Sequence, residues 1–421
     1  MRIGIIGAGA AGLTTAWLLD PDHDVTLFEK RPRLGGHVDT VEVERDGERI
    51  HIDAGFEFFD GTMFPTFTRL LGILGVPVRS YPITVTLHHA DHGRVTLLPP
   101  VRGRRVPWSA LGPRQLLDLL QFQRVYGKAA RLVGTKDPSL TLDDFLKSVA
   151  LTTRFREGVI YPCLLGGWDV DLDEFKRFSA YNVLKYFVLT RSSAQWTEVA
   201  GGARVYVDAL ARALTRTDIR RSANIEQISR AGDRWVVRDT NGRVGAFDHL
   251  VVATNAYEAR QLLAGIHETE RLCRDLSAIE YFKTTIAVHG DRRLMPARET
   301  HWSVANIRYD GVHSASTIWK GWKSSAPVFR SWITHDTRSI DPLYAVATYY
   351  HPKPTPDYFR MQPKLAARQG QDRLWLAGLY THDIDCHESA ILSAVKVAEG
   401  LAPRSANLTR LLGSARASSE S

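Results

Sequence analysis

The alternation of apolar and polar positions at the start of the chain predicts a strand, a turn, a helix and a second strand. The first strand covers residues 2–6, and a glycine-rich turn at residues 7–12 separates it from a helix at residues 13–19. The second strand covers residues 24–28. This order is typical of a βαβ unit, so the sequence predicts an α/β fold.

Later segments predict the elements of a second region. Large apolar residues at helical spacing predict amphipathic helices at residues 111–134, 142–151 and 181–189. Strand-like runs follow at residues 284–288 and 343–350, among many aromatic residues. The helix at 111–134 leaves two interpretations open: packing on the substrate-binding region, which is the more frequent outcome, and peripheral contact with a membrane.

Composition places the chain among ordinary globular proteins. With 421 residues, 44% of them hydrophobic and 24% charged, the chain can bury a large core and is expected to form two domains. There is no run of 18 apolar residues, and the first strand is too short for a signal peptide, so a cytoplasmic location is expected. Residues 405–421, rich in Ser, Ala and Arg, are expected to be a flexible tail.

Charge and cysteine content exclude some classes of function. The net charge of +8 comes mainly from arginine, with a dense stretch at residues 94–105. A solvated basic surface is the more frequent meaning of such a stretch, and an anionic substrate, a carrier protein or a membrane face is the alternative. No segment resembles a nucleic-acid-binding module. Cys163, Cys273 and Cys386 are far apart and odd in number, which disfavours a disulfide framework and a zinc site, and Cys386 is expected to be a buried free thiol.

The glycine-rich turn has the chemistry of a dinucleotide site. Gly7 allows a tight turn, Gly9 lets the backbone approach a pyrophosphate, and Gly12 permits close packing of helix on strand. The N-terminus of the helix predicted at residues 13–19 offers unpaired N–H groups and a partial positive charge. Glu29 ends the second strand and suits a free ribose 2′-hydroxyl, which favours FAD or NAD over NADP.

The continuation separates FAD from NAD. After Glu29 and Lys30 the chain reads Gly35-Gly36-His37, and here it resembles the flavin-containing amine oxidase and phytoene desaturase superfamily, closest to bacterial predicted NAD/FAD-binding amine-oxidase-like proteins. Further segments resemble that superfamily in its own order: residues 52–59, 64–76, 196–206, 248–254, 374–378 and 387–399. The resemblance therefore covers nearly the whole chain.

The resemblance implies FAD as the cofactor and a glutathione-reductase-like, Rossmann-type FAD-binding domain with an interleaved α+β substrate domain that contains a mixed sheet and helices. The FAD domain would comprise residues 1–75, 205–265 and 365–404, and the substrate domain residues 76–204 and 266–364. The residues that would bind FAD are Gly7, Gly9, Ala10, Ala11, Gly12, Glu29, Lys30, Gly35, Gly36, His37, Gly55, Phe56, Glu57, Phe58, Ile225, Ala253, Gly378, Leu379, Ser389 and Ala390.

Catalytic candidates lie in the closing segment. His387 and Glu388 are expected just before a helix that begins near Ser389, where either could move a proton; an unperturbed histidine has a pKa of ~6.5, which suits work at neutral pH. The equal alternative is that both residues cap the helix or hold a loop. Tyr380 is a weaker candidate, and the spacing of the acids and histidines between them disfavours a metal site. No motif supports a role for Lys320 or Lys323.

Three hypotheses of function follow. The leading one is an FAD-dependent oxidoreductase that oxidises a C–N or C–C bond of a small apolar or acyl-type substrate, free or carrier-bound, in lipid or specialised-metabolite biosynthesis. The second is a redox-neutral, FAD-dependent double-bond isomerase or cyclase. The third is a flavin-binding scaffold without catalysis, which uses the basic surface to bind a partner.

Overall fold

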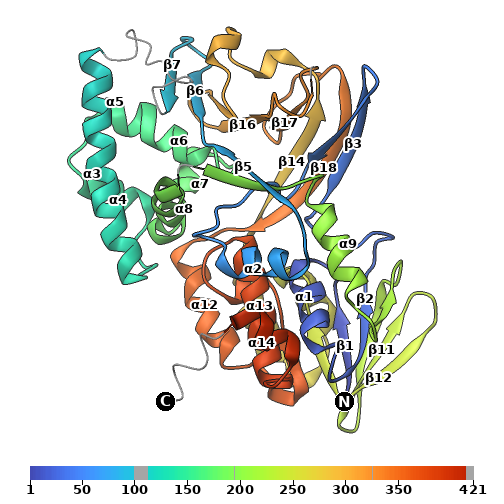
Figure 1. Cartoon of the computed structure of the whole chain (residues 1–421). Helices are drawn as coiled ribbons and strands as arrows, with labels where there is room; N and C mark the ends of the chain where they lie inside the picture. The colour runs from blue at the N-terminus through green and yellow to red at the C-terminus, as the bar shows by residue number, and fades with distance from the viewer. Residues whose placement is uncertain (99–111, 194, 325, 414–421) are drawn as a thin grey trace.

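A five-stranded parallel sheet forms the lower half of the molecule in Figure 1. The structure is a computed structural model, and it describes residues 1–98, 112–193, 195–324 and 326–413. Neighbouring strands of the sheet run in the order β19 (Leu374–Leu376), β13 (His249–Val252), β1 (Arg2–Ile6), β2 (Asp24–Phe28) and β9 (Asp218–Arg220). Each adjacent pair is parallel, as the βαβ pattern predicts.

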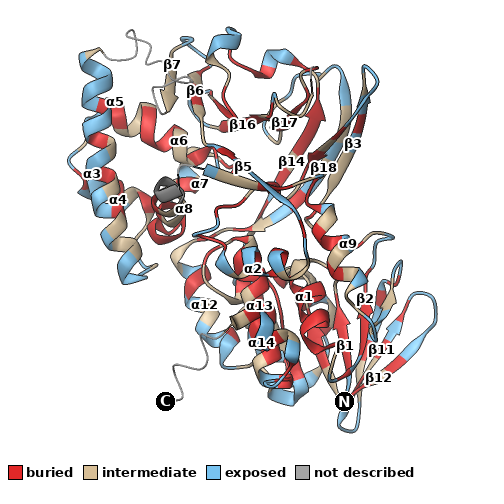
Figure 2. Cartoon of the chain, in the orientation of Figure 1, coloured by how far each residue is buried: buried red, intermediate tan, exposed pale blue. Residues whose placement is uncertain are grey.

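Helices cover this sheet and make its core almost wholly apolar. Every residue of α1 (Ala10–Leu19) except Ala10 is buried, because α13 (His387–Leu401) packs along it. Figure 2 shows the two helices mostly in the colour of buried residues. The other helices around this part are α2 (Pro65–Ile73), α9 (Arg204–Arg212), α10 (Ala256–Leu263), α11 (Glu270–Ser277), α12 (Pro356–Ala366) and α14 (Ala406–Leu412).

A seven-stranded mixed sheet forms the second part, in the upper half of Figure 1. Its strands follow the order β18 (Leu343–Pro352), β14 (Tyr281–His289), β17 (Phe329–Trp332), β16 (Ser314–Trp319), β15 (Ala305–Tyr309), β6 (Val85–His89) and β7 (Val95–Leu98). Only the β15–β6 pair is parallel. Side chains alternate between its two faces, so Val288, Ile318 and Arg330, which are register partners, lie on one face, while Thr317 and Ser331 lie on the other.

A helical layer flanks this sheet with its own apolar core. It contains α3 (Pro113–Thr135), α4 (Leu142–Ser148), α5 (Thr153–Phe155), a π-helical turn at Arg156–Ile160, α6 (Tyr161–Leu165), α7 (Leu172–Lys176) and α8 (Ala180–Ser193). Short 3₁₀ turns elsewhere cover His267–Thr269, Arg292–Leu294, Glu299–His301, Gln371–Arg373 and Leu379–Thr381.

Smaller sheets connect and extend the two parts. Two antiparallel pairs are β3 (Thr40–Arg45) with β4 (Glu48–Asp53), which form a hairpin, and β5 (Val78–Pro82) with β8 (Gln195–Val199). A three-stranded antiparallel sheet consists of β10 (Ile225–Ala231), β11 (Arg234–Asp239) and β12 (Val244–Phe247). Because β5 and β8 are far apart in sequence, their pairing ties the start of the second part to the segment that leads into α9.

The predicted fold class, a Rossmann-type α/β part combined with a mixed sheet and helices, is confirmed. Several boundaries differ. The helix predicted over 142–151 ends at Ser148, because Val149 adopts extended dihedrals. The helix expected from Ser389 begins at His387, so His387 and Glu388 lie in its first turn rather than before it.

The prediction of a flexible tail from Ser405 is wrong for residues 406–412. These residues form α14, whose Leu408 and Leu411 are buried, and the Ser405 hydroxyl donates to the Leu18 carbonyl. Of the predicted basic stretch, Arg102, Arg104 and Arg105 lie outside the described residues, as do residues 414–421. None of the described helices is both long and apolar enough to cross a membrane.

Candidate functional site

The predicted dinucleotide cradle lies at the carboxyl edge of the parallel sheet. Gly7 follows β1 with a φ of 101°, and its N–H donates to the Phe28 carbonyl at 2.8 Å. A Cβ on Gly12 would lie 1.8 Å from the Gly7 carbonyl oxygen, so only glycine lets α1 start this close to the turn. Gly9 is the N-cap of α1, and Ala10 and Ala11 begin the helix. The free N–H groups of this helix end suit a phosphate.

Glu29 lies where a ribose hydroxyl acceptor is expected. Its buried carboxylate accepts hydrogen bonds from the backbone N–H groups of Ala8 and Arg31, each at 2.9 Å. These bonds fix the side chain beside the glycine turn and leave lone pairs for a further donor. Lys30, by contrast, is exposed and pairs with Glu258 at 2.5 Å. Ile225 is buried at the start of β10.

The double glycine packs directly against this turn. Gly35 forms a parallel bridge with Gly9, and its N–H donates to the Ala8 carbonyl at 2.8 Å. Gly36 has a φ of 59°, and a Cβ there would lie 3.0 Å from the Cα of Gly9. A Cβ on Gly55 would lie 1.7 Å from the His37 carbonyl oxygen. Glycine at these positions therefore lets the backbone of the turn, the double glycine and the segment at Gly55 pack closely together.

The closing segment reaches the same edge from the other end of the chain. Ala253 follows β13, and its N–H donates to the Ile6 carbonyl at 2.8 Å. Gly378 follows β19, and its N–H donates to the hydroxyl of Ser393 in α13 at 2.9 Å. Leu379 lies in the 3₁₀ turn after Gly378. Ser389 and Ala390 are buried in the first turns of α13. The positive end of a fifteen-residue helix therefore points at this edge.

His387 lies in an aromatic cluster where α13 meets α2 and α9. Its ring stacks on Phe56 at a centroid distance of 3.9 Å, and its Nε2 lies 2.9 Å from the Tyr206 hydroxyl. Burial lowers the pKa of His387 to about 3, because the imidazolium would lose its hydration among these rings. The pKa of an unperturbed histidine, which made His387 a candidate, therefore does not apply to it here.

Glu388 caps a helix other than the one that the sequence suggested. Its carboxylate accepts from the N–H groups of Thr66 and Phe67, in the first turn of α2, both at 2.8 Å. Burial, partly offset by these bonds, raises the pKa of Glu388. Through these bonds Glu388 orients α13 against α2.

The third catalytic candidate, Tyr380, is fully buried in the apolar core, and burial raises its pKa.

A buried ionic cluster is the feature that the sequence did not reveal. The Lys320 ammonium lies 2.9 Å from Glu57 Oε1 and 2.5 Å from Glu198 Oε2, and its side chain is 2% exposed. Lys323 lies 3.4 Å from the same Glu198 oxygen. Arg330 Nε lies 3.8 Å from Glu57 Oε2. Burial opposes the charge on Lys320, but the two carboxylates outweigh it and raise its pKa.

Aromatic side chains surround this cluster. Phe58 stacks on Trp196 at a centroid distance of 4.0 Å, and Tyr81 contacts Trp322 at 4.7 Å. The Lys320 ammonium lies 5.2 Å from the centre of the Tyr81 ring. Of these residues, only Glu57 and Phe58 are among the predicted site residues. The others come from strands and loops far apart in sequence, and a sequence motif could not have grouped them.

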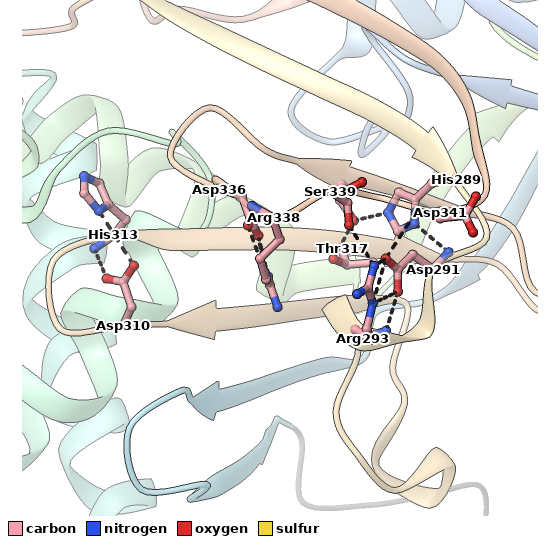
Figure 3. A network of polar contacts seen from close by, with 11 residues as sticks. His289, Asp291, Arg293, Asp310, His313, Thr317, Asp336, Arg338, Ser339 and Asp341 are labelled. Atoms are coloured by element: carbon pink, nitrogen blue, oxygen red, sulfur yellow. Dashed lines mark hydrogen bonds and ion pairs between the residues drawn. The ribbon is translucent and has the colours of Figure 1, made fainter.

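A second polar network lies on the opposite face of the seven-stranded sheet (Figure 3). His289 Nε2 lies 2.7 Å from the Ser331 hydroxyl, and His289 Nδ1 accepts from the Asp291 N–H. Because Nδ1 accepts, Nε2 carries the proton and donates to Ser331, so His289 cannot deprotonate that serine. Asp291 also pairs with Arg293. The network holds strands together and contributes no group to the site above.

Comparisons with known proteins agree with this architecture. A family model described as "Flavin containing amine oxidoreductase" matches residues 10–289. The zeta-carotene desaturase of Zea mays is 47% identical over 62 residues, which are 14% of this chain and 10% of the desaturase. The chain thus matches only a tenth of that relative's length.

Two solved structures share the fold over almost their whole length. The CLA-producing fatty acid isomerase from P. acnes has a TM-score of 0.71 at 16% identity, with 95% of this chain and 98% of that chain covered. The cyclohexylamine oxidase from Brevibacterium oxydans IH-35A has a TM-score of 0.67 at 16% identity, with 95% and 99% covered. At these identities the likeness establishes the fold alone.

Proposed function

Because the chain belongs to the flavin containing amine oxidoreductase family, we propose that it oxidises a C–N or C–C bond of a small apolar or acyl-type substrate. It is a flavoenzyme, and its cofactor is FAD. What we propose beyond this is the kind of bond that is oxidised and the class of substrate.

The glycine turn and Glu29 offer the backbone approach and the acceptor that FAD needs. We propose that the glycine turn and the N-terminus of α1 bind the pyrophosphate, that Glu29 accepts a ribose hydroxyl, and that Gly35 and Gly36 follow the phosphates toward the flavin. Bound FAD supplies the hydride-accepting isoalloxazine. The first turn of α13 would direct its partial positive charge at the ring.

One observation carries the proposal: the glycine cradle lies next to a cluster of aromatic rings. The double glycine leads to His37, whose carbonyl accepts from the Phe56 N–H at 3.0 Å, and the Phe56 ring stacks on His387. Aromatic side chains beside a cofactor site suit an apolar substrate. A neutral His387 can orient neighbouring groups, such as the Tyr206 hydroxyl, through hydrogen bonds.

A second candidate is a redox-neutral double-bond isomerase. The observation that favours it is the fold likeness to the CLA-producing fatty acid isomerase, with a TM-score of 0.71. Isomerisation would use the same aromatic cluster and the same cofactor, and it would consume no electron acceptor.

Anaerobic spectroscopy separates these candidates. The purified holoenzyme is mixed without oxygen with candidate amines and with unsaturated fatty acids, while the visible absorbance band of the flavin is recorded and products are weighed by mass spectrometry. Lasting bleaching that oxygen reverses is expected for net oxidation. An unchanged band with a product of unchanged mass would establish the isomerase. A band that no substrate changes, with no product, would contradict both and favour a scaffold.

A further inference from the structure

Arg330 is a buried arginine with few protein partners. It lies in β17, on the face of the seven-stranded sheet that carries Val288 and Ile318, and it is 7% exposed. Its guanidinium donates one hydrogen bond to the described residues, from Nη2 to the Ala54 carbonyl at 3.4 Å. A guanidinium carries five N–H donors, so most of its capacity is unused by the described part of the chain.

The nearest carboxylate does not satisfy Arg330. The separation of 3.8 Å between Arg330 Nε and Glu57 Oε2 is too long for a hydrogen bond, and both atoms are buried without a hydrogen-bond partner among the described residues. Glu57 instead contacts Lys320 through its other oxygen at 2.9 Å. Trp322 Nε1, on the Tyr81 side of the cluster, is a further buried donor without a partner in the described chain.

Buried polar groups in native proteins are almost always hydrogen-bonded, so a cluster of unpaired ones marks a place where a ligand completes the bonding. Lys320 and Lys323 are paired with the two glutamates, Glu57 and Glu198, whereas Arg330 makes no hydrogen bond to a carboxylate among the described residues. Two further acids interact electrostatically with this cluster: Asp53 with Lys323 and Glu57, and Asp169 with Arg330. Burial raises the pKa of Asp53 to about 6 and that of Asp169 to about 7, so both are weaker counter-charges than ordinary carboxylates.

The geometry of Arg330 suits a planar anion. Its guanidinium carbon lies 5.4 Å from the centre of the Trp332 ring, a contact that restrains its orientation. A restrained guanidinium presents parallel N–H groups that match the two oxygens of a carboxylate. The site lies beside the stretch from Ala54 to Glu57, and Phe56 in this stretch belongs to the aromatic cluster around His387.

We propose that Arg330 binds the carboxylate of the substrate, so that the substrates are carboxylic acids with an apolar chain. The inference rests on the proposed function, because it assigns the polar end of the molecule whose oxidation is proposed above. A fatty acid and an α-amino acid share this carboxylate chemistry, and Arg330 recognises that shared group.

Calorimetric titration of the holoenzyme tests the proposal without turnover. The probes are decanoate, its neutral amide decanamide, and 2-aminodecanoate. Wild type is expected to bind decanoate at least about tenfold more tightly than decanamide, the effect of a charge-assisted hydrogen bond on affinity. Arg330→Gln should remove this preference. Equal affinities in wild type, or an unchanged preference in Arg330→Gln, would overturn the proposal.

Two further variants keep the test decisive. Arg293→Gln, in the 3₁₀ turn after β14, where Arg293 pairs with Asp291, is the control for loss of an arginine elsewhere and should keep the preference. If Arg330→Gln loses FAD, Arg330→Lys decides the matter: lysine keeps the charge but lacks the planar fork, so the preference should fall severalfold, and an unchanged preference would overturn the proposal. Tighter binding of 2-aminodecanoate than of decanoate would identify amino acids as the source of the carboxylate.

Failure of this inference can be told from failure of the proposed function. If decanoate binds through Arg330 but no acid ever bleaches the flavin, the proposed oxidation is contradicted, and carboxylate binding by Arg330 is supported. If decylamine bleaches the flavin equally in wild type and Arg330→Gln, and neither protein binds decanoate, carboxylate binding by Arg330 is contradicted and the proposed oxidation is supported.

Discussion

Replacement of Lys320 by methionine should destabilise the protein in a way that acid partly reverses. Methionine has a similar length and no charge, so Lys320→Met removes the ammonium that lies between Glu57 and Glu198 while it keeps most of the packing. Both glutamate side chains are 5% exposed or less, so they cannot regain hydration without movement of the strands around them.

The expected loss follows from these distances. At an effective dielectric constant of about 20, each Lys320–glutamate pair has roughly 6 kcal/mol of gross attraction, most of which offsets desolvation. Removal of one partner from a buried ion pair costs about 3–5 kcal/mol. With about 2 cal/mol/K of unfolding entropy per residue, a 421-residue chain should unfold about 3–6 °C lower.

The pH dependence gives the sharper test. Burial alone would raise the pKa of Glu198, but Lys320 and Lys323 lower it below its usual value. In wild type, Glu198 therefore contributes stability that is present above its unfolded pKa and is lost as pH falls through its folded pKa. Without Lys320, burial dominates, the folded pKa lies above the unfolded one, and stability is lost as pH rises. The gap between wild type and Lys320→Met should widen from pH 5 to pH 8.

Thermal unfolding of both holoproteins, followed by circular dichroism at several pH values, measures this gap. Lys323→Met is the control: its side chain is 15% exposed and it leaves Lys320 in place, so it should cost less. The double variant Lys320→Met/Glu198→Gln should recover part of the loss, because the amide carries no charge. An equal melting temperature for Lys320→Met and wild type at pH 8, or a gap that widens in acid, would refute the reasoning.

Three further outcomes are expected. Gly12→Ala would place a methyl group 1.8 Å from the Gly7 carbonyl oxygen, so the variant should lose FAD during gel filtration, and full retention of flavin would contradict this role of the close approach. Glu388→Ala leaves two N–H groups of α2 without their acceptor and should lower the free energy of unfolding by about 2 kcal/mol in chemical denaturation; a change within measurement error would show that water replaces the carboxylate. Because the pKa of His387 is about 3, wild type and His387→Gln should show parallel pH profiles of flavin reduction between pH 5 and 8, and a step near pH 6.5 present only in wild type would disprove a neutral His387.

Secondary structure was predictable wherever its signal is local. The strand, glycine turn and helix at the start of the chain lie as expected, because the hydrogen bonds and close contacts of a βαβ unit join residues a few positions apart. The helix start at His387 was missed by two residues, since no capping side chain marks it: Cys386 is the N-cap and makes no side-chain hydrogen bond. The helix after Ser405 was missed because its stability comes from Leu408 and Leu411 against the core rather than from its own residues.

The sequence by itself determined the α/β class and the cofactor cradle, since the glycines and Glu29 act within one continuous stretch. Only the tertiary structure decided the chemistry next to the cradle. A histidine in water has an ordinary pKa, but the packing of Phe56 and Tyr206 against His387 reduces its hydration and keeps it neutral. Lys320 and Arg330 become a buried ionic cluster because segments far apart in sequence bring Glu57 and Glu198 to them. Burial and charge pairing depend on distance in space, which a sequence read along the chain does not contain.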